Sequence, residues 1–106
     1  MKLTVRAPCC FSRRSCFDTA KYVVDVEKRE VITEIPAIRC YRGVERYYEV
    51  EIAEEKKDSI VVVEHYVSNR NVHYLRFEHP KQPSPEILSA VKETLGLIEA
   101  IKLVVR

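Results

Sequence analysis

A pattern of strand, tight turn and strand repeats along the middle of this chain, from Lys21 to His79, and no other feature constrains the fold as much. Runs rich in Val, Ile and Tyr are separated by short polar segments, at Lys28-Arg29, Arg42-Gly43, Glu55 to Asp58 and Asn69 to Asn71. β-branched and aromatic residues favour extended strands, whereas Gly and Asn tolerate the backbone angles of tight turns. The pattern therefore predicts five antiparallel strands that follow one another in a meander.

The last two strands have the best-defined register. A three-residue loop at Asn69 to Asn71 sets four pairs opposite each other: Val63 and Phe77, His65 and Leu75, Glu64 and Arg76, Tyr66 and Tyr74. The earlier turns place Tyr22 beside Ile35, Ile35 beside Val50 and Val50 beside Val63. The strand over residues 47–52 is thus predicted to lie in the middle of the sheet.

A helix is predicted after the last strand. Ser84-Pro85-Glu86 supplies a capping hydroxyl, Pro at the first helical position and an acid in the first turn. Ile87, Leu88, Val91 and Leu95 then fall on one side at helical spacing, so this helix can lie on the apolar face of the sheet. For residues 97–105 we favour a continued helix over a strand that pairs with residues 2–7.

These elements predict a single α+β domain over residues 1–106. Its fold is an antiparallel meander sheet of about five to six strands, covered on one face by a C-terminal helix. The formal charge of +2 sums 18 basic and 16 acidic residues, so net charge indicates no partner. No run reaches the about 18 to 20 apolar residues that a membrane span needs, and we expect a cytoplasmic protein without a membrane partner.

Four cysteines stand near the start of the chain: Cys9, Cys10, Cys16 and Cys40. Thirteen Glu and 18 Lys plus Arg against two Asn and one Gln are typical of a thermophilic, archaeal-like protein. Intracellular disulfides are common in such organisms, so the cysteines are candidates for disulfides. Their spacing fits no short zinc motif, and we expect no metal and no cofactor. Buried thiols are the alternative, and the pairing stays open, although Cys9 and Cys10 are not expected to bond each other.

A row of large side chains is predicted on the sheet face away from the helix, formed by Ile38, Tyr47, Tyr66 and Tyr74. Such a row can stack nucleic-acid bases or bind a protein. Acidic residues predicted on the same face repel phosphates and favour a protein partner or a second copy of the chain: Asp25, Glu34, Glu49, Glu51, Glu64 and Glu78. The alternative is that the tyrosines only shield the sheet.

Arginines gather at one end of the predicted sheet. The set is Arg39, Arg42, Arg46 and Arg70, joined by Arg13 and Arg14. Arg39 is predicted opposite Arg46, and like charges that face each other favour an anion between them. This end is therefore a candidate anion or nucleic-acid site, with local pairing to Glu45 as the alternative.

No catalytic motif, phosphate loop or zinc-protease signature occurs in the sequence. We therefore expect a non-enzymatic binding module that self-associates or binds a protein partner through the tyrosine-bearing face. A nucleic-acid-binding protein that uses the arginine-rich end is the first alternative, and a metal-assisted enzyme is the second. His65 and His73 are expected to be histidines at the core edge rather than metal ligands.

Overall fold

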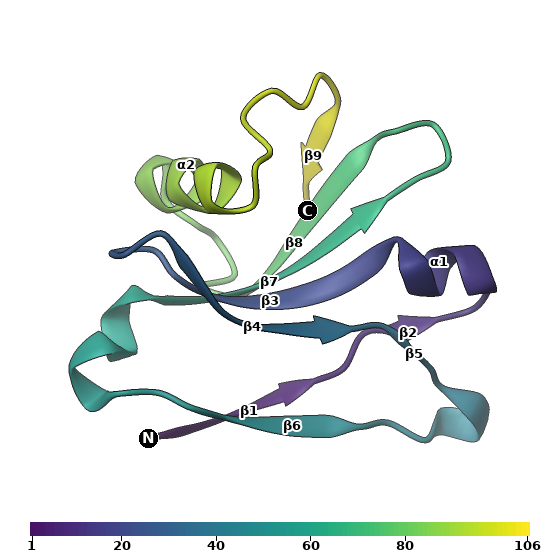
Figure 1. The fold of residues 1–106 in the computed structure, drawn as a ribbon, viewed down its shortest axis with the longest axis horizontal. Coiled ribbons are helices and arrows are strands. Elements are labelled where there is room, and N and C mark those ends of the chain that lie inside the picture. Colours follow the sequence, from purple (N-terminus) through teal and green to yellow (C-terminus); the bar gives the residue numbers. More distant parts are fainter.

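Five strands form the central sheet, in the order β4-β3-β7-β8-β9 (Figure 1). The structure is a computed structural model that describes residues 1–106, with the exception of the side chain of Arg42. The strands are β3 (Thr19–Asp25), β4 (Glu30–Pro36), β7 (Ile60–Val67), β8 (His73–His79) and β9 (Leu103–Val105). Neighbouring strands are antiparallel except for β8 and β9, which are parallel.

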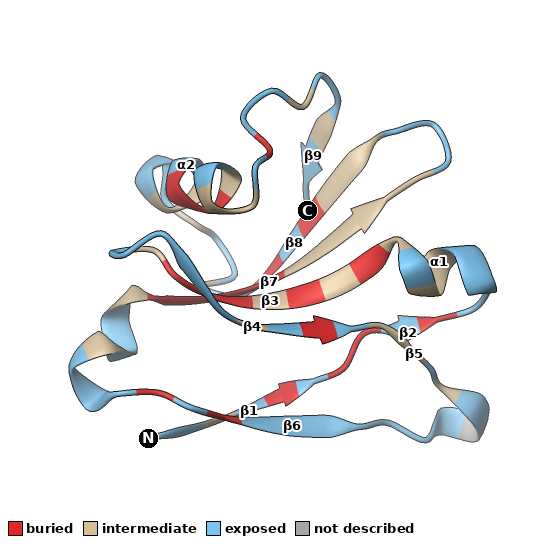
Figure 2. Ribbon diagram, viewed as in Figure 1, coloured by how far each residue is buried: buried red, intermediate tan, exposed pale blue. Residues whose placement is uncertain are grey.

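A two-stranded ribbon lies against one face of this sheet. It consists of β1 (Lys2–Arg6) and β6 (Tyr47–Glu51), which pair antiparallel with Leu3 opposite Val50. Its apolar side chains form one buried cluster with residues of the central sheet, namely Val5, Ala7, Val50 and Ile52 with Val23, Ile35, Ile60 and Val62. The ribbon is therefore a second layer that buries one face of β3, β4 and β7 (Figure 2).

The helix α2 (Pro85–Thr94) lies on the other side of the sheet from the ribbon (Figure 1). The Ser84 side chain caps it by accepting a hydrogen bond of 3.2 Å from the Ile87 amide, and Pro85 follows at the first position. Val91 and Leu97 form a second buried cluster with Val24, Val61, Val63, Leu75 and Phe77. The predicted helix start is confirmed.

Short elements build the end of the molecule that lies at the right in Figure 1. They are β2 (Cys9–Cys10), α1 (Arg13–Phe17), the two-residue strand β5 (Ile38–Arg39) and the 3-10 turn η1 (Tyr41–Gly43). β2 and β5 pair in parallel, and the Val67 amide donates to the Asp18 carbonyl, so α1 abuts the end of β7. A second 3-10 turn, η2 (Glu54–Ser59), lies at the opposite end.

The α+β class, the five-stranded sheet, the C-terminal helix and the register of the last hairpin are confirmed. All four predicted pairs between β7 and β8 occur. The predicted meander is wrong, because β6 leaves the central sheet and β3 pairs directly with β7. Val50 and Ile52 are buried in either arrangement, so alternation of apolar residues cannot tell in which layer the strand lies.

Two local predictions are also wrong. Residues 97–105 do not continue the helix, because Gly96 takes a left-handed backbone (φ +70°) and β9 then pairs with β8 rather than with residues 2–7. Tyr22 faces Glu34 instead of Ile35. Two features cause the difference. The Asp25 carboxylate accepts hydrogen bonds from the amides of Glu27 and Lys28, which fixes a four-residue loop before β4, and the register then shifts by one residue between Val23 and Val24.

Candidate functional site

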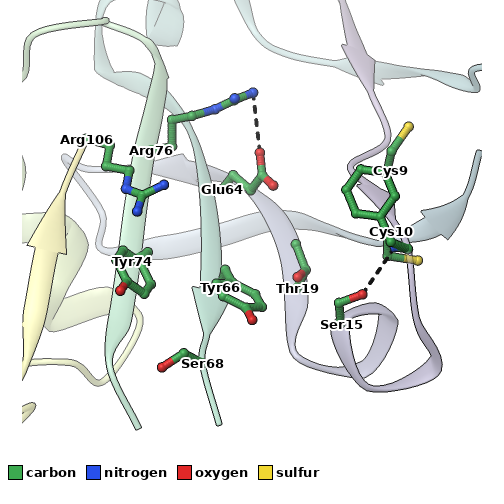
Figure 3. A pocket seen from close by; sticks show the side chains of 11 residues that line it. Cys9, Cys10, Ser15, Thr19, Glu64, Tyr66, Ser68, Tyr74, Arg76 and Arg106 are labelled. Carbon is green, nitrogen blue, oxygen red and sulfur yellow. Dashed lines mark hydrogen bonds and ion pairs between the residues drawn. The ribbon is translucent and has the colours of Figure 1, made fainter. Parts of the chain in front are cut away.

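Two tyrosines on adjacent strands form the centre of the candidate site. Tyr66 on β7 and Tyr74 on β8 lie directly opposite each other, with ring centroids 6.0 Å apart and ring planes 26° apart. The guanidinium carbon of Arg106, which follows β9, lies 4.6 Å from the centroid of the Tyr74 ring (Figure 3). This distance is typical of a cation–π contact.

The tyrosine pair lines an open pocket of about 520 Å³. Alternation along β7 places Tyr66 on the same side as Val62, which is the side covered by the ribbon, but the ribbon leaves this part of the face open. The opposite wall is formed by Cys10 of β2 and Ser15 of α1 (Figure 3). Phe11, in the segment between β2 and α1, also lines this wall. Phe11 is 95 % exposed, so its ring contributes little to the core.

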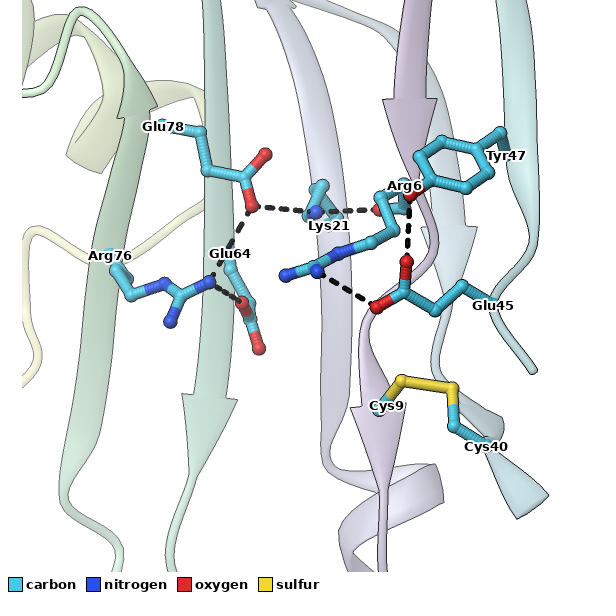
Figure 4. Close-up of polar contacts among 9 residues, drawn as sticks. All are labelled: Arg6, Cys9, Lys21, Cys40, Glu45, Tyr47, Glu64, Arg76 and Glu78. Atoms are coloured by element: carbon cyan, nitrogen blue, oxygen red, sulfur yellow. Dashed lines mark hydrogen bonds and ion pairs between the residues drawn. A yellow bond between two sulfur atoms is a disulfide. The ribbon is translucent and has the colours of Figure 1, made fainter. Parts of the chain in front are cut away.

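The acidic groups next to the tyrosine pair already have cationic partners. Arg76 lies 3.5 Å from Glu64 and 3.6 Å from Glu78, and the buried ammonium of Lys21 lies 2.7 Å from Glu78 (Figure 4). In the part of the chain that the structure describes, no carboxylate forms an ion pair with the Arg106 side chain. The pocket thus presents aromatic rings and guanidinium groups, with Glu64 as the acid that lines it.

The predicted row of four side chains is only half assembled. Tyr66 and Tyr74 lie side by side, but Tyr47 lies on β6 in the ribbon and Ile38 on β5. The acids predicted beside them are also dispersed. Glu49 and Glu51 lie on the ribbon, Glu34 lies beside Tyr22, and the buried Asp25 is bound to Lys56 at 2.8 Å.

The arginine residues predicted to gather at one end lie on elements that share the right-hand end in Figure 1. Arg13 and Arg14 belong to α1, Arg39 to β5, Arg46 to the segment before β6 and Arg70 to the turn between β7 and β8. The Arg13 guanidinium lies 5.8 Å from the Phe17 ring centroid and Arg14 pairs with Asp18 at 3.2 Å. The side chain of Arg42 lies outside the described part of the structure.

Glu45 was the expected local partner of these arginines, but it is engaged elsewhere. Its carboxylate accepts hydrogen bonds from Tyr47 Oη at 2.7 Å and from Arg6 at 3.1 Å (Figure 4). The hydrogen bond from Tyr47, followed by the contact with Arg6, holds the pKa of Glu45 below its ordinary value. Among the ion pairs of the described side chains, none involves Arg39, Arg46 or Arg70.

The four cysteines form two disulfides, Cys9–Cys40 and Cys10–Cys16, with Cα–Cα distances of 5.4 Å and 5.1 Å. The prediction that Cys9 and Cys10 do not bond each other is confirmed. Both crosslinks hold the segment that carries Phe11, so they fix one wall of the pocket. Pairing with Cys40 ties this wall to the end of β5 (Figure 4).

His65 and His73 lie outside the pocket, on the helix side of the sheet. Their rings are parallel within 5°, but the centroids are 5.1 Å apart while His65 Nε2 and His73 Nδ1 are 2.9 Å apart, so the rings meet edge to edge in a hydrogen bond. Burial, and secondly the charge of His73, lower the pKa of His65. The described residues contain no group of three or more His, Cys, Asp or Glu side chains that could hold a metal.

Among the aromatic and arginine side chains of the pocket, three were not predicted from the sequence: Phe11, Arg76 and Arg106. Arg76 was assigned only as the partner of Glu64. Phe11 lies in a segment without periodicity, and Arg106 reaches Tyr74 only because β9 pairs with β8. Their common signal was their type, since aromatic and arginine side chains are frequent in binding sites.

No described helix is long enough and apolar enough to cross a membrane. Comparison with family models, with curated proteins and with solved structures gives no match for this chain.

Proposed function

We propose that the protein is a non-enzymatic binding module that contacts nucleic acid through its arginine-rich end and the adjoining tyrosine pocket. The observation that carries this proposal is a pocket lined by aromatic rings together with Arg76 and Arg106. The arginine-rich end adds Arg39, Arg46 and Arg70, and among the described side chains these three and Arg106 form no ion pair. Arginine binds phosphate through a planar set of donors, and aromatic rings stack on bases.

The distribution of acids supports this proposal. Six carboxylates on the tyrosine face were expected to repel phosphate. Of these six, only Glu64 lines the pocket, and the Arg76 guanidinium lies 3.5 Å from the Glu64 carboxylate, so this repulsion is weak. Other acids of the chain, such as Glu54 and Glu55 on η2, lie at the opposite end of the molecule. The elements at the right-hand end in Figure 1 carry Arg13, Arg14, Arg39, Arg46 and Arg70, so the charge of these arginines attracts a phosphate backbone to this end.

Self-association is the second candidate function. It is favoured by the outer strand β9, where Val104 and Val105 are 40 % and 41 % exposed and the strand edge is unpaired. Two β9 strands that pair antiparallel around Val104 place Lys102 opposite Arg106, and like charges in that position are unfavourable. This repulsion ranks a dimer through β9 below a nucleic-acid contact.

The disulfides bear on the compartment that we propose. Disulfides persist in secreted proteins and in the cytosol of hyperthermophiles. A nucleic-acid ligand and a composition rich in Glu, Lys and Arg favour the second setting. We therefore propose that the protein is a cytoplasmic protein of a thermophile.

Fluorescence anisotropy with a labelled mixed-sequence oligonucleotide tests the proposed function. We expect binding at about 50 mM salt that weakens steeply towards about 200 mM, because phosphate contacts release counterions. Replacing Arg39, Arg46 and Arg70 together by Ala should remove most of this affinity. The matched control is Arg29→Ala at the opposite end, where Arg29 lies near Glu93.

Light scattering on the same samples reports the second candidate. A dimer that ignores the oligonucleotide at about 50 mM salt contradicts the nucleic-acid proposal and favours self-association. Equal loss of affinity in the triple variant and in Arg29→Ala contradicts the assignment to the arginine-rich end.

A further inference from the structure

We propose that the ligand is a single strand of nucleic acid whose bases stack along an aromatic strip formed by Phe11, Tyr41, Tyr66 and Tyr74. This inference rests on the proposed function and adds to it the class of nucleic acid and the side chains that select it. The aromatic strip runs from the tyrosine pair on the sheet, across the disulfide-linked segment, to η1.

Two adjoining hollows make the strip continuous. The larger one is the pocket of about 520 Å³ beside Tyr66 and Tyr74, and the smaller one, of about 160 Å³, is lined by Arg39 and Tyr41. Both hollows are also lined by Cys10 and Phe11. The two hollows therefore share Cys10 and Phe11 as a common boundary, so a strand that follows the strip can pass from one hollow to the other.

The rings of Phe11 and Tyr41 are open to solvent. Phe11 is 95 % exposed and Tyr41 is 67 % exposed, so their faces are free to accept a partner. A single exposed aromatic residue is ordinary on a protein surface, but here exposed rings continue a pocket that already holds a stacked tyrosine pair. Every base has a flat face that can stack on such rings, which gives affinity without demanding one sequence.

Guanidinium groups accompany the rings. Arg106 lies over Tyr74, and Arg39 donates a hydrogen bond of 3.2 Å to Tyr41 Oη. Each pair holds a cation beside a ring, which is the arrangement that a nucleotide needs when its base stacks and its phosphate is neutralised. Arg76 lines the pocket between them and lies near Glu64.

Two disulfides and a hydrogen bond restrain the segment that carries Phe11. Cys10 is bonded to Cys16 and Cys9 to Cys40, and the Phe11 amide donates to Ser15 Oγ at 3.2 Å. The Ser12 side chain caps α1 immediately afterwards. A wall that is already ordered loses little conformational entropy on binding, so the exposed ring can contribute fully to affinity.

The shape of the site favours a single strand over a duplex. Bases in a duplex are stacked on each other and paired, so flat rings within a pocket cannot reach their faces. A pocket of about 520 Å³ has the size of a site for a small molecule, which suits an unstacked nucleotide. A duplex can touch only the arginines at the rim.

Three fluorescent probes of about ten nucleotides test the inference: a mixed-sequence single strand, the same strand without bases, and the duplex. We expect the full single strand to bind tightest and the strand without bases at least about 5-fold more weakly. Phe11→Ala and Tyr74→Ala should each weaken single-strand binding about 5- to 100-fold, whereas Tyr74→Phe, which keeps the ring, should bind nearly normally. Arg106→Ala should reduce the salt slope by about 0.7.

Tyr47→Ala is the matched aromatic control, because Tyr47 is 60 % exposed but lies on the ribbon away from the strip. Phe11→Ala keeps the test valid if the tyrosine variants unfold, since the Phe11 ring is outside the core. Equal binding of all three probes, with loss only in arginine variants, overturns the aromatic strip but leaves nucleic-acid binding through the arginine-rich end standing. Absence of binding to every probe overturns both, and a dimer that needs Tyr66 and Tyr74 identifies a second copy as the occupant instead.

Discussion

Lys21 is the residue whose placement the sequence least suggests. It is 1 % exposed on β3, beneath the ribbon, and its ammonium donates to the Arg6 carbonyl at 2.5 Å and pairs with Glu78 at 2.7 Å. A buried cation is tolerated only when its hydrogen bonds and its charge are satisfied, and both conditions hold here. Lys21 therefore joins the ribbon to the far strand β8 through polar contacts.

Removing this cation tests how much the contact contributes. Lys21→Ala removes the charge and leaves a cavity, so we expect the free energy of unfolding to fall by about 3 kcal/mol. Lys21→Met keeps the stem and leaves Glu78 with Arg76 and solvent, so the loss should be only about 1 kcal/mol. Urea denaturation compares the two variants. If the two variants lose the same stability, the packing of the Lys21 stem contributes little and the loss of the charge accounts for the whole effect.

His65 makes the stability of the protein depend on pH near neutrality. The folded state lowers the pKa of His65 below its ordinary value of 6.5, so the unfolded chain binds more protons there than the folded one. The free energy of unfolding should therefore fall as the pH drops below 6.5 and level off once His65 is protonated in the folded protein. Urea denaturation at several pH values measures this slope. His65→Gln should flatten it, whereas His79→Gln, at an exposed strand end, should not.

At the scale of elements, α2 shows how local chemistry sets a boundary. The Ser84 hydroxyl accepts from the Ile87 amide and Gly96 ends the helical segment with its left-handed backbone. We expect Ser84→Ala to lower the free energy of unfolding by about 1 kcal/mol, because one amide of the first turn loses its partner. Ser89→Ala, on the exposed side of the same helix, should leave stability unchanged or raise it slightly. Thermal denaturation distinguishes the two, and equal effects would contradict a capping role.

Elements defined by neighbouring residues could be predicted from the sequence. The hairpin of β7 and β8 depends on one short loop, and the start of α2 depends on three consecutive residues. Val50 and Ile52 could be buried either within the central sheet or in a second layer. β6 lies in the second layer because it pairs with β1, which is distant in sequence. The alternation of apolar residues therefore could not predict the pairing between distant strands.

Contacts between distant parts of the chain also explain why only half of the candidate site could be predicted. Tyr66 and Tyr74 were predicted side by side because their register follows from the hairpin loop. Phe11 and Arg106 reach the tyrosine pair through a disulfide and through the parallel pairing of β9, and neither contact leaves a local pattern in the sequence. The aromatic strip is thus assembled from four separate parts of the chain.

At the scale of the whole molecule, the disulfides tie the right-hand end together. Cys9–Cys40 closes a sequence separation of 31 residues and Cys10–Cys16 one of 6. Loop entropy predicts that replacing the first pair by Ser lowers the free energy of unfolding by about 4 kcal/mol and the second by about 2 kcal/mol. Chemical denaturation of the two double variants measures this order, and a larger loss at Cys10–Cys16 would contradict the entropic account.

The disulfide pairing reports the register of β2 against β5, because the adjacent residues Cys9 and Cys10 belong to two different bridges. Successive residues of a strand point to opposite sides, so Cys9 faces Cys40 while Cys10 faces Cys16. A molecule in which β2 had slipped by one residue against β5 would exchange the two partners and carry the crossed bridges. The two registers would give two different disulfide isomers. Peptide mapping of the oxidised protein therefore determines the strand register from its disulfide pairing.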